Sequence, residues 1–559
     1  MKKLIALFLA LIMTMSLMTG LASAEDKALQ LTKSGAGMGD KIDYPWMNLF
    51  ILGGLMWRTL FFVEPDMTTL NPDLASGYTV SDDGLTYTID FVGGKWSDGE
   101  DLTVEDVVFS IKSNLKAAAS NGIYTSAFAK IEGAAEWRDG AADDLAGLTV
   151  DGNKITIKLS SPHSILPNVL AQFVILPEHC LKDADLLEIA NNEFWGKPVT
   201  SGMYRVDEFK VGAYYTLVPN EYYDGPAPKI PKIIVHFVAD TITAAQAGLV
   251  DMYNTNSQAD ISELSKISGM KMYPVDIMFY RYFLANIEGV DGKANPAMAD
   301  VRVRQALLYA IDRATLAESL FPGLATVSNS GVSNDNPASI GTEYPYNPDL
   351  AKQLLTDAGY DFTRPIRILY YYSDQATQDF VDAIASYMAA VGVTVEGRYT
   401  SNPGEDNYVT RDYDVLYAIS YYLGEIGLKT EVVKTSSGTQ DLFKTREYDI
   451  GYKGLSAFDI SEWYGEYSAS NANFKNVFNA DPAFDGPINE YLAATTQEAK
   501  DAALAALQQL EAEKVYKLPM YTIGNNVFIN EDHVQLPEGI VFGNPWYKTN
   551  IHFEDWELK

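Results

Sequence analysis

Residues 81–111 read SDDGLTYTIDFVGGKWSDGEDLTVEDVVFSI, and this stretch decides the fold class. The turn predicted at 82–84 is followed by a half-buried strand, because every second residue is apolar: Leu85, Tyr87, Ile89 and Phe91. After a second turn at 97–99, Thr103 and Asp106 have the spacing of a capping box, with Asp in place of the usual Glu or Gln. The helix expected there buries Val104, Val107, Val108 and Ile111. A strand followed directly by a helix favours an α/β fold.

The same alternation continues along the chain. A further half-buried strand is predicted from alternating residues, namely Ile155, Ile157 and Leu159. Asp300 is placed to cap one helix, and Asn347 followed by Pro348 is placed to begin another. Gly359 supplies the left-handed residue at which that second helix ends. Strands and helices are therefore mixed rather than segregated, as in α/β lobes.

The amino-terminal residues have the pattern of a secretory signal peptide. Lys2 and Lys3 precede an apolar run over 4–18, and Ala22-Ser23-Ala24 provides a small-x-small cleavage site. Cleavage after Ala24 would leave 535 of the 559 residues. That length exceeds what one hydrophobic core supports, so two or more lobes are expected in the exported chain.

Composition and charge exclude several classes of function. With 47% hydrophobic and 21% charged residues, the chain has the composition of an ordinary globular protein. Its formal charge of −32 repels nucleic acid. The one cysteine, Cys180, cannot form an internal disulfide, and the five histidines have no metal-ligand spacing, so we expect no metal and no cofactor. No catalytic triad, nucleophile elbow or zinc-protease motif is present, and we expect no enzyme.

Several blocks resemble family 5 of the bacterial extracellular solute-binding proteins, the oligopeptide, dipeptide and nickel group, in the order in which that family has them. The blocks are NPDLASGYTVSDDGLTYTI (71–89), WSDGEDLTVEDVVFS (96–110), PVTSGMYR (198–205), NEYYDG (220–225), DVRVRQALLYAIDR (300–313), YNPDLAKQLLTDAGY (346–360) and the closing HFEDWEL (552–558). Together they extend over most of residues 70–559.

The resemblance implies a periplasmic-binding-protein type II fold of cluster C, with three α/β lobes and a hinged ligand cleft. By analogy the chain divides into lobe I (25–71, 191–280 and 516–559), lobe II (72–190) and lobe III (281–515). Strands that cross between lobes are expected near 278–284 and 521–528. Closure of the lobes over the ligand is the motion that such proteins share.

The function that the resemblance implies is capture of an oligopeptide outside the cytoplasmic membrane and delivery to an ABC import permease. We expect a monomer. Residues 21–25 contain no cysteine for a lipid anchor, which favours a free periplasmic protein, with a cell-surface or extracellular location as the alternative. An oligosaccharide is the main alternative ligand, and a nickel chelate is disfavoured by the few histidines. A secreted hydrolase is the alternative from another class.

Family members that bind peptides pair the α-amino group with a carboxylate, and Asp459 matches that position if one extra residue is allowed after Ala457. Leu455 replaces the family tryptophan, and a surface loop is the alternative interpretation of this segment. An enclosed ammonium group needs such a counter-charge. The aromatic residues predicted to contact the ligand are Trp463, Tyr464, Trp46 and Trp57.

An internal repeat with an offset of 35 residues relates 387–414 to 422–449. Each copy contains a glycine between a helix-like and a strand-like stretch. Two copies are too few for a solenoid, so we interpret them as a duplicated helix–strand unit within one lobe.

Overall fold

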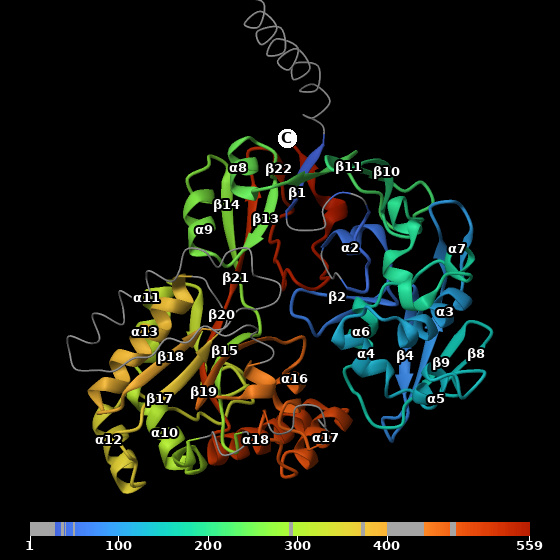
Figure 1. Ribbon diagram of the computed structural model, residues 1–559. Coiled ribbons are helices and arrows are strands. Elements are labelled where there is room, and N and C mark those ends of the chain that lie inside the picture. The colour runs from blue at the N-terminus through green and yellow to red at the C-terminus, as the bar shows by residue number, and fades with distance from the viewer. Residues whose placement is uncertain are drawn as a thin grey trace, which may run out of the picture. The chain divides into compact units, whose positions relative to one another are not determined.

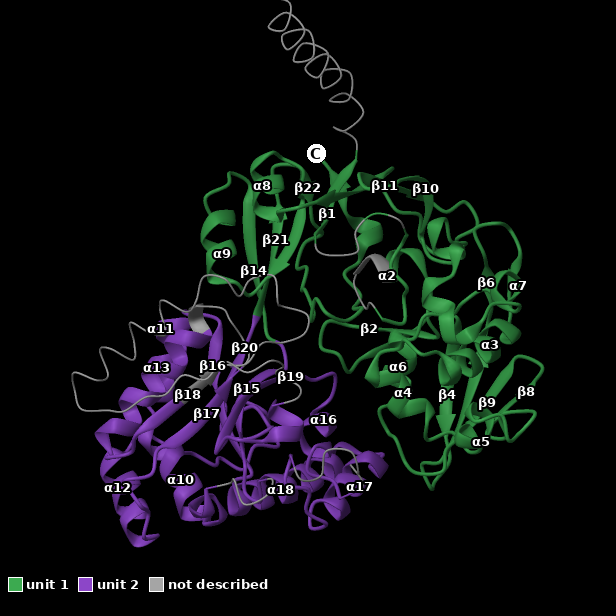
Figure 2. Ribbon diagram, in the orientation of Figure 1, with its two compact units in different colours: residues 1–276, 525–559 green, residues 277–524 purple. Residues whose placement is uncertain are grey.

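The computed structural model describes residues 28–34, 39, 41–47, 51–289, 295–370, 375–399, 441–469 and 477–559. The described chain divides into two compact units, which Figure 2 shows in green and purple. Unit 1 comprises residues up to 276 together with 525–559, and unit 2 comprises 277–524. The predicted signal peptide and most of the 35-residue repeat lie outside the described residues.

Unit 1 contains two four-stranded sheets and one three-stranded sheet, with orders β1-β12-β11-β10, β4-β5-β9-β8 and β13-β21-β14. Its strands are β1 Leu29–Ser34, β2 Phe61–Val63, β3 Leu70–Pro72, β4 Ala75–Val80, β5 Thr86–Phe91, β6 Gly94–Lys95, β7 Asp101–Leu102, β8 Leu148–Asp151, β9 Lys154–Lys158, β10 Tyr204–Lys210, β11 Tyr214–Pro219, β12 Ile233–Val238, β13 Met252–Thr255, β14 Met270–Val275, β21 Asn525–Asn530, β22 Val534–Gln535 and β23 Glu557–Leu558. Its helices are α2 Ile51–Met56, α3 Val104–Lys116, α4 Gly122–Phe128, α5 Ala134–Arg138, α6 Leu166–Gln172, α7 Glu178–Leu181, α8 Thr241–Gln246 and α9 Gln258–Leu264.

The strand and helix predicted from 81–111 are confirmed. β5 pairs antiparallel with β4 and β9, and its buried residues are the alternating Tyr87, Ile89 and Phe91. α3 begins after Thr103 with the capping box to Asp106 in place. The local sequence is therefore sufficient to specify this part of unit 1.

Unit 2 is built on one six-stranded mixed sheet of order β16-β20-β15-β19-β17-β18 (Figure 1). Its strands are β15 Phe279–Ala285, β16 Ala325–Val327, β17 Ile366–Tyr370, β18 Val395–Tyr399, β19 Ile450–Ser456 and β20 Lys517–Ile523. Its helices are α10 Val301–Ala310, α11 Arg313–Leu320, α12 Pro348–Asp357, α13 Gln375–Ala390, α16 Ile460–Gly465, α17 Asp485–Ala493 and α18 Gln497–Lys514. The predicted caps Asp300 and Asn347 are confirmed, and Gly359 has the expected positive φ of 68°.

The sheet of unit 2 separates two hydrophobic cores, because alternate residues of a strand point to opposite faces. On β15, Phe283 and Ala285 join a core with α10–α13, whereas Tyr282 and Leu284 join a core with α16–α18. Unit 2 is therefore a helix–sheet–helix sandwich, and β19 is an interior strand of it.

The chain passes from unit 1 to unit 2 after Asp276 and returns after Gly524. β20 belongs to the sheet of unit 2, although the family analogy assigned residues from 516 onward to lobe I. Unit 1 contains the ranges predicted for lobe II and most of lobe I. The three-lobe division itself stays a prediction.

Candidate functional site

Asp459 lies just beyond the end of β19 and forms the N-cap of α16. Its Oδ1 accepts a hydrogen bond of 2.8 Å from the Ser461 backbone N–H, and its Oδ2 accepts one of 3.0 Å from the Tyr491 hydroxyl. Glu462 completes a capping box by accepting from the backbone N–H groups of Asp459 and Phe458. The segment is therefore an ordered strand-to-helix junction and not an irregular surface loop.

Asp459 and Glu462 form a half-buried pair of carboxylates without a cation. Neither of them makes an ion pair with a basic side chain in the part of the chain that the structure describes. Burial raises the pKa of Glu462 to about 7, and the neighbouring charges of Asp459 and Glu466 add to that effect. Such a pair is an environment that a positively charged group would stabilise.

Glu511 of α18 binds the aromatic residues that follow Asp459. Its Oε1 accepts from Trp463 Nε1 at 2.7 Å and from the Tyr467 hydroxyl at 3.1 Å, and its Oε2 accepts from the Tyr464 hydroxyl at 3.0 Å. All three aromatic side chains have 0% exposure. In this conformation Trp463 and Tyr464 support the Asp459 junction from within the core, and their contact with a ligand stays a prediction.

Two lysines neutralise the buried acids behind the junction. Lys517 and Lys453 lie 2.8 and 3.0 Å from the two carboxylate oxygens of Glu466. Burial alone would raise the pKa of Glu466, but the two lysine charges outweigh it and lower that pKa to about 2. The charge of Lys517 also stabilises the Glu511 carboxylate and partly offsets the rise in its pKa that burial causes. Two cations thus offset Glu466 and Glu511, whereas no described basic side chain pairs with Asp459 or Glu462.

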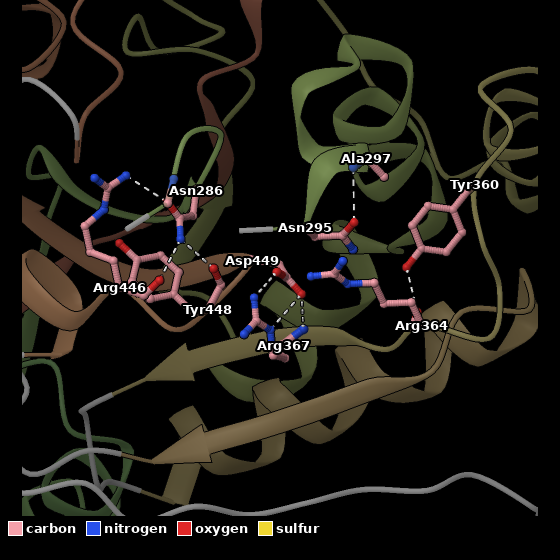
Figure 3. A network of polar contacts seen from close by, with 10 residues as sticks. Asn286, Asn295, Ala297, Tyr360, Arg364, Arg367, Arg446, Tyr448 and Asp449 are labelled. Carbon is pink, nitrogen blue, oxygen red and sulfur yellow. Dashed lines mark hydrogen bonds and ion pairs between the residues drawn. The ribbon is translucent and has the colours of Figure 1, made fainter. Parts of the chain in front are cut away.

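An ion pair fixes the position of β19, the strand that leads to Asp459 (Figure 3). Arg367 of β17 donates from Nη2 to Asp449 Oδ1 at 2.7 Å, and its backbone N–H donates to Asp449 Oδ2 at 2.8 Å. Asn286 donates to the carbonyl groups of Arg446 and Tyr448 at 2.9 and 2.7 Å. These contacts hold the start of β19 against β17 and the end of β15.

The two tryptophans predicted in unit 1 have different environments. Trp46 has 0% exposure, donates from Nε1 to the carbonyl oxygen of Val174 at 2.9 Å and stacks on Phe173. Trp57 is 2% exposed, and its indole N–H has no hydrogen-bond partner within the described part of the chain. The indole N–H of Trp46 therefore has its acceptor within the core, whereas the indole N–H of Trp57 is available to a ligand acceptor.

Trp57 lines a cavity of about 220 Å³ inside unit 1. Arg58 at its wall is neutralised by Asp73 and Asp224, each at 2.6 Å. Lys548, another lining residue, donates to the carbonyl oxygen of Gln172, and burial lowers its pKa. Among the described residues that line this cavity, the Trp57 indole N–H is the donor that lacks an acceptor, and a carbonyl or carboxylate oxygen would fit it. A second cavity of about 370 Å³, beside β14 and β22, contains none of the predicted residues.

Sequence reasoning located Asp459 but missed Glu462, Tyr491 and Glu511. The Asp459–Glu462 spacing is itself a capping-box signal and could have revealed the helix start. No local pattern could have revealed Glu511, which is 48 residues from Trp463 in the chain.

Comparison with known proteins agrees with this architecture. Residues 69–422 match the family model described as "Bacterial extracellular solute-binding proteins, family 5 Middle". A putative ABC transporter peptide-binding protein of Brucella ovis is 29% identical over 373 residues, which cover 64% of this chain and 66% of that protein. The oligopeptide-binding protein AppA of Bacillus subtilis is 28% identical over 308 residues, with 53% and 52% covered. The chain thus spans somewhat less than two thirds of the Brucella relative and about half of AppA.

Solved structures show the same fold. A putative peptide-binding protein AppA from Clostridium difficile superposes with a TM-score of 0.73 at 17% identity, covering 95% of this chain and 100% of that one. The B. subtilis AppA complex with a nonapeptide gives a TM-score of 0.66 at 18% identity, covering 95% and 100%. These neighbours are type II periplasmic binding proteins of mixed α/β content. Among the described residues, no helix combines the length and apolar character needed to cross a bilayer. By its match over more than half its length, the chain belongs to family 5 of the bacterial extracellular solute-binding proteins.

Proposed function

We propose that this chain captures oligopeptides outside the cytoplasmic membrane and delivers them to an ABC import permease without chemical change. The observation that carries the proposal is the half-buried carboxylate pair Asp459 and Glu462, which has no cation among the described residues. The ammonium group of a peptide supplies the missing charge, and a charge-assisted hydrogen bond at such a position is about twice as strong as a neutral one. The names of the Brucella and Bacillus relatives agree with a peptide ligand.

Trp57 is proposed to provide a second contact. Its buried indole N–H lacks an acceptor, so a ligand carbonyl or carboxylate oxygen that enters the adjoining cavity would satisfy it. Three buried aromatic residues would support the site by fixing the helices and strands that carry it, namely Trp46, Trp463 and Tyr464. Hinge closure of the lobes and a monomeric state belong to the same proposal.

The test compares binding of matched ligands by isothermal titration calorimetry. A mixture of short peptides with free amino termini should bind, whereas the same peptides N-acetylated should bind at least tenfold more weakly, because the acetyl group removes the positive charge. Neutral oligosaccharides serve as the competing ligand class. Heat from oligosaccharides alone would overturn the peptide assignment.

The variant Asp459→Asn isolates the charge, because asparagine is an equally good N-cap residue. We expect it to lower the affinity for free-amino peptides by about 10- to 100-fold. That is the lower part of the range of affinity losses found when one partner of a buried charge pair is removed. Asp312→Asn is the matched control, since Asp312 caps α11 in the same way. If Asp459→Asn and Asp312→Asn bind peptides equally well, the assignment of the α-amino partner is wrong.

A further inference from the structure

Three potential metal ligands of different chemistry converge at the surface of unit 1. Asp98 lies in the turn between β6 and β7, and His179 and Cys180 follow one another on α7. His179 Nε2 lies 2.9 Å from Asp98 Oδ2, and the ligand atoms of all three residues lie within 4.8 Å of one another. This oxygen, nitrogen and sulfur set is the kind that binds Zn²⁺ and related divalent transition metals.

The turn and the helix are held together by a buried carboxylate that is not itself one of the three. Asp106 Oδ1 accepts from the Glu178 backbone N–H at 2.8 Å, so it anchors the start of α7. Its Oδ2 accepts from Trp96 Nε1 at 3.3 Å and from the Thr103 backbone N–H at 2.9 Å, so it also anchors the residues on both sides of the β6–β7 turn. In Figure 2, β6, α3 and α7 accordingly lie beside one another.

The Asp98 turn is fixed by its own contacts as well. The backbone N–H of Ser97 donates to the carbonyl oxygen of Thr200 at 2.8 Å, and the backbone N–H of Thr200 donates to the Ser97 hydroxyl at 3.0 Å. Gly99 has a φ of 94°, a conformation suited to glycine, and its N–H donates to the Trp96 carbonyl. The Trp96 ring lies 6.2 Å from the His179 ring and limits where the imidazole can move. The backbone that carries the three ligands is therefore positioned before any ion arrives.

The three side chains are accessible to an ion from solvent and contribute little to the packing of the fold. Asp98 and His179 side chains are each 35% exposed, and Cys180 is exposed. Cys180 is the sole cysteine of the chain, so no internal disulfide competes for its sulfur. An exposed Asp–His pair by itself contributes little to the stability of the fold, because solvent screens its charges.

We propose that Asp98, His179 and Cys180 bind one divalent transition-metal ion of the Zn²⁺ type, with water as the fourth ligand. Bond lengths of about 2.0–2.3 Å place the ligand atoms of a tetrahedral Zn²⁺ about 3.3–3.8 Å apart. The three ligand atoms already lie within 4.8 Å of one another, so only small side-chain movements are needed, and Asp98 Oδ2 and His179 Nε2, now 2.9 Å apart, would separate slightly. The thiol proton is released to solvent on binding. This ion would link the β6–β7 turn to α7 and is separate from the proposed peptide site.

Cobalt provides the direct test, because a thiolate bound to Co²⁺ gives a sulfur-to-metal charge-transfer band in the near ultraviolet. The purified chain, free of any histidine tag and kept with a non-thiol reductant, is titrated with Co²⁺ and then with Zn²⁺ as competitor. We expect one ion per chain, with the band abolished in Cys180→Ser. His179→Gln and Asp98→Asn should each weaken Co²⁺ binding at least tenfold, because each removes a direct ligand.

His552→Asn is the matched control. His552 is exposed, and its Nδ1 lies 3.6 Å from Oε1 of the half-buried Glu554 in a pair that includes no thiol. Asparagine tolerates the positive φ at that position. Its Co²⁺ titration should equal that of the unaltered chain. As a second readout, Zn²⁺ should raise the melting temperature of the unaltered chain but not that of Cys180→Ser. An unchanged cobalt spectrum in Cys180→Ser, or no saturable binding to the unaltered chain, would overturn the proposal.

Discussion

The indole Nε1 of Trp463 donates a 2.7 Å hydrogen bond to Oε1 of Glu511, where the tryptophan has no exposed surface and the glutamate has 4%. The hydroxyls of Tyr464 and Tyr467 and the backbone N–H of Gly331 donate to the same carboxylate. One acid on α18 thereby fixes α16, the helix that Asp459 caps. The geometry of the proposed ammonium site thus depends on a buried contact behind Asp459.

Replacement of Glu511 by glutamine should destabilise the chain by about 3 kcal/mol. The amide group keeps one acceptor oxygen but presents N–H donors to partners that are themselves donors, and it removes a charge that faces buried Lys517. Chemical denaturation followed by tryptophan fluorescence measures the loss. Glu513→Gln, on the exposed side of the same helix, should change the free energy of unfolding by less than about 0.5 kcal/mol. Equal effects of the two substitutions would show that the Glu511 contacts do not stabilise the fold.

Loss of the Asp449 charge should also destabilise unit 2. Asp449 has no exposed surface, and Asp449→Asn removes a buried charge that pairs with the Arg367 guanidinium at 2.7 Å, for a cost of about 3 kcal/mol. Denaturant midpoints measure the loss, with Asp357→Asn, at an exposed position on α12, as the control. A midpoint as high as that of the control would contradict a structural role for the Arg367–Asp449 pair.

The local elements were predictable because their signals lie within a few residues of each other. Thr103 and Asp106 predict the start of α3, and Asn347 with Pro348 predicts the start of α12, which ends near Gly359. These signals are local because capping and φ preferences depend on immediate neighbours. Family resemblance added the overall architecture, which periodicity alone could not supply.

The candidate site was less predictable, because burial depends on partners distant in sequence. Trp463 and Tyr464 form an aromatic cluster whose composition suggests a ligand-contacting wall, yet Glu511 provides the acceptor that allows them to be buried. The Asp98 and His179 pair spans 81 residues, so no spacing rule for metal ligands could detect it. In both cases the tertiary fold, and not the local pattern, creates the chemical environment.

The stability of the chain should contain a pH-dependent contribution from Glu462. Its pKa is raised from 4.5 to about 7, chiefly by burial, so between these values the folded state retains a proton that the unfolded state has lost. The folded state then binds more protons, and stability falls as the pH rises through this window. At about 1.4 kcal/mol per unit of pKa, the difference between 4.5 and about 7 limits the loss to about 3 to 4 kcal/mol.

The variant Glu462→Gln isolates that contribution, because its amide oxygen can still accept from the backbone of Phe458 and Asp459. The difference in free energy of unfolding between the unaltered chain and this variant should favour the unaltered chain most below about pH 4.5. It should decline toward pH 7 and then level off. A difference that stays constant from pH 4 to pH 8 would show that the pKa of Glu462 is not raised.

Trp46 and Trp57 should respond in opposite ways to replacement by phenylalanine, which removes the indole N–H. Trp46→Phe breaks the hydrogen bond to the carbonyl oxygen of Val174 and leaves that oxygen buried without its partner, so stability should fall by about 1 kcal/mol more than in Trp57→Phe. Trp57→Phe loses no hydrogen bond in the free chain but should weaken peptide binding by about 5- to 10-fold, the value of one neutral hydrogen bond. Denaturation and calorimetric titration of both variants separate the two effects.

Unchanged peptide affinity in Trp57→Phe would remove Trp57 from the proposed site. An equal loss of stability in both variants would show that the Trp57 indole N–H has a hydrogen-bond partner in solution.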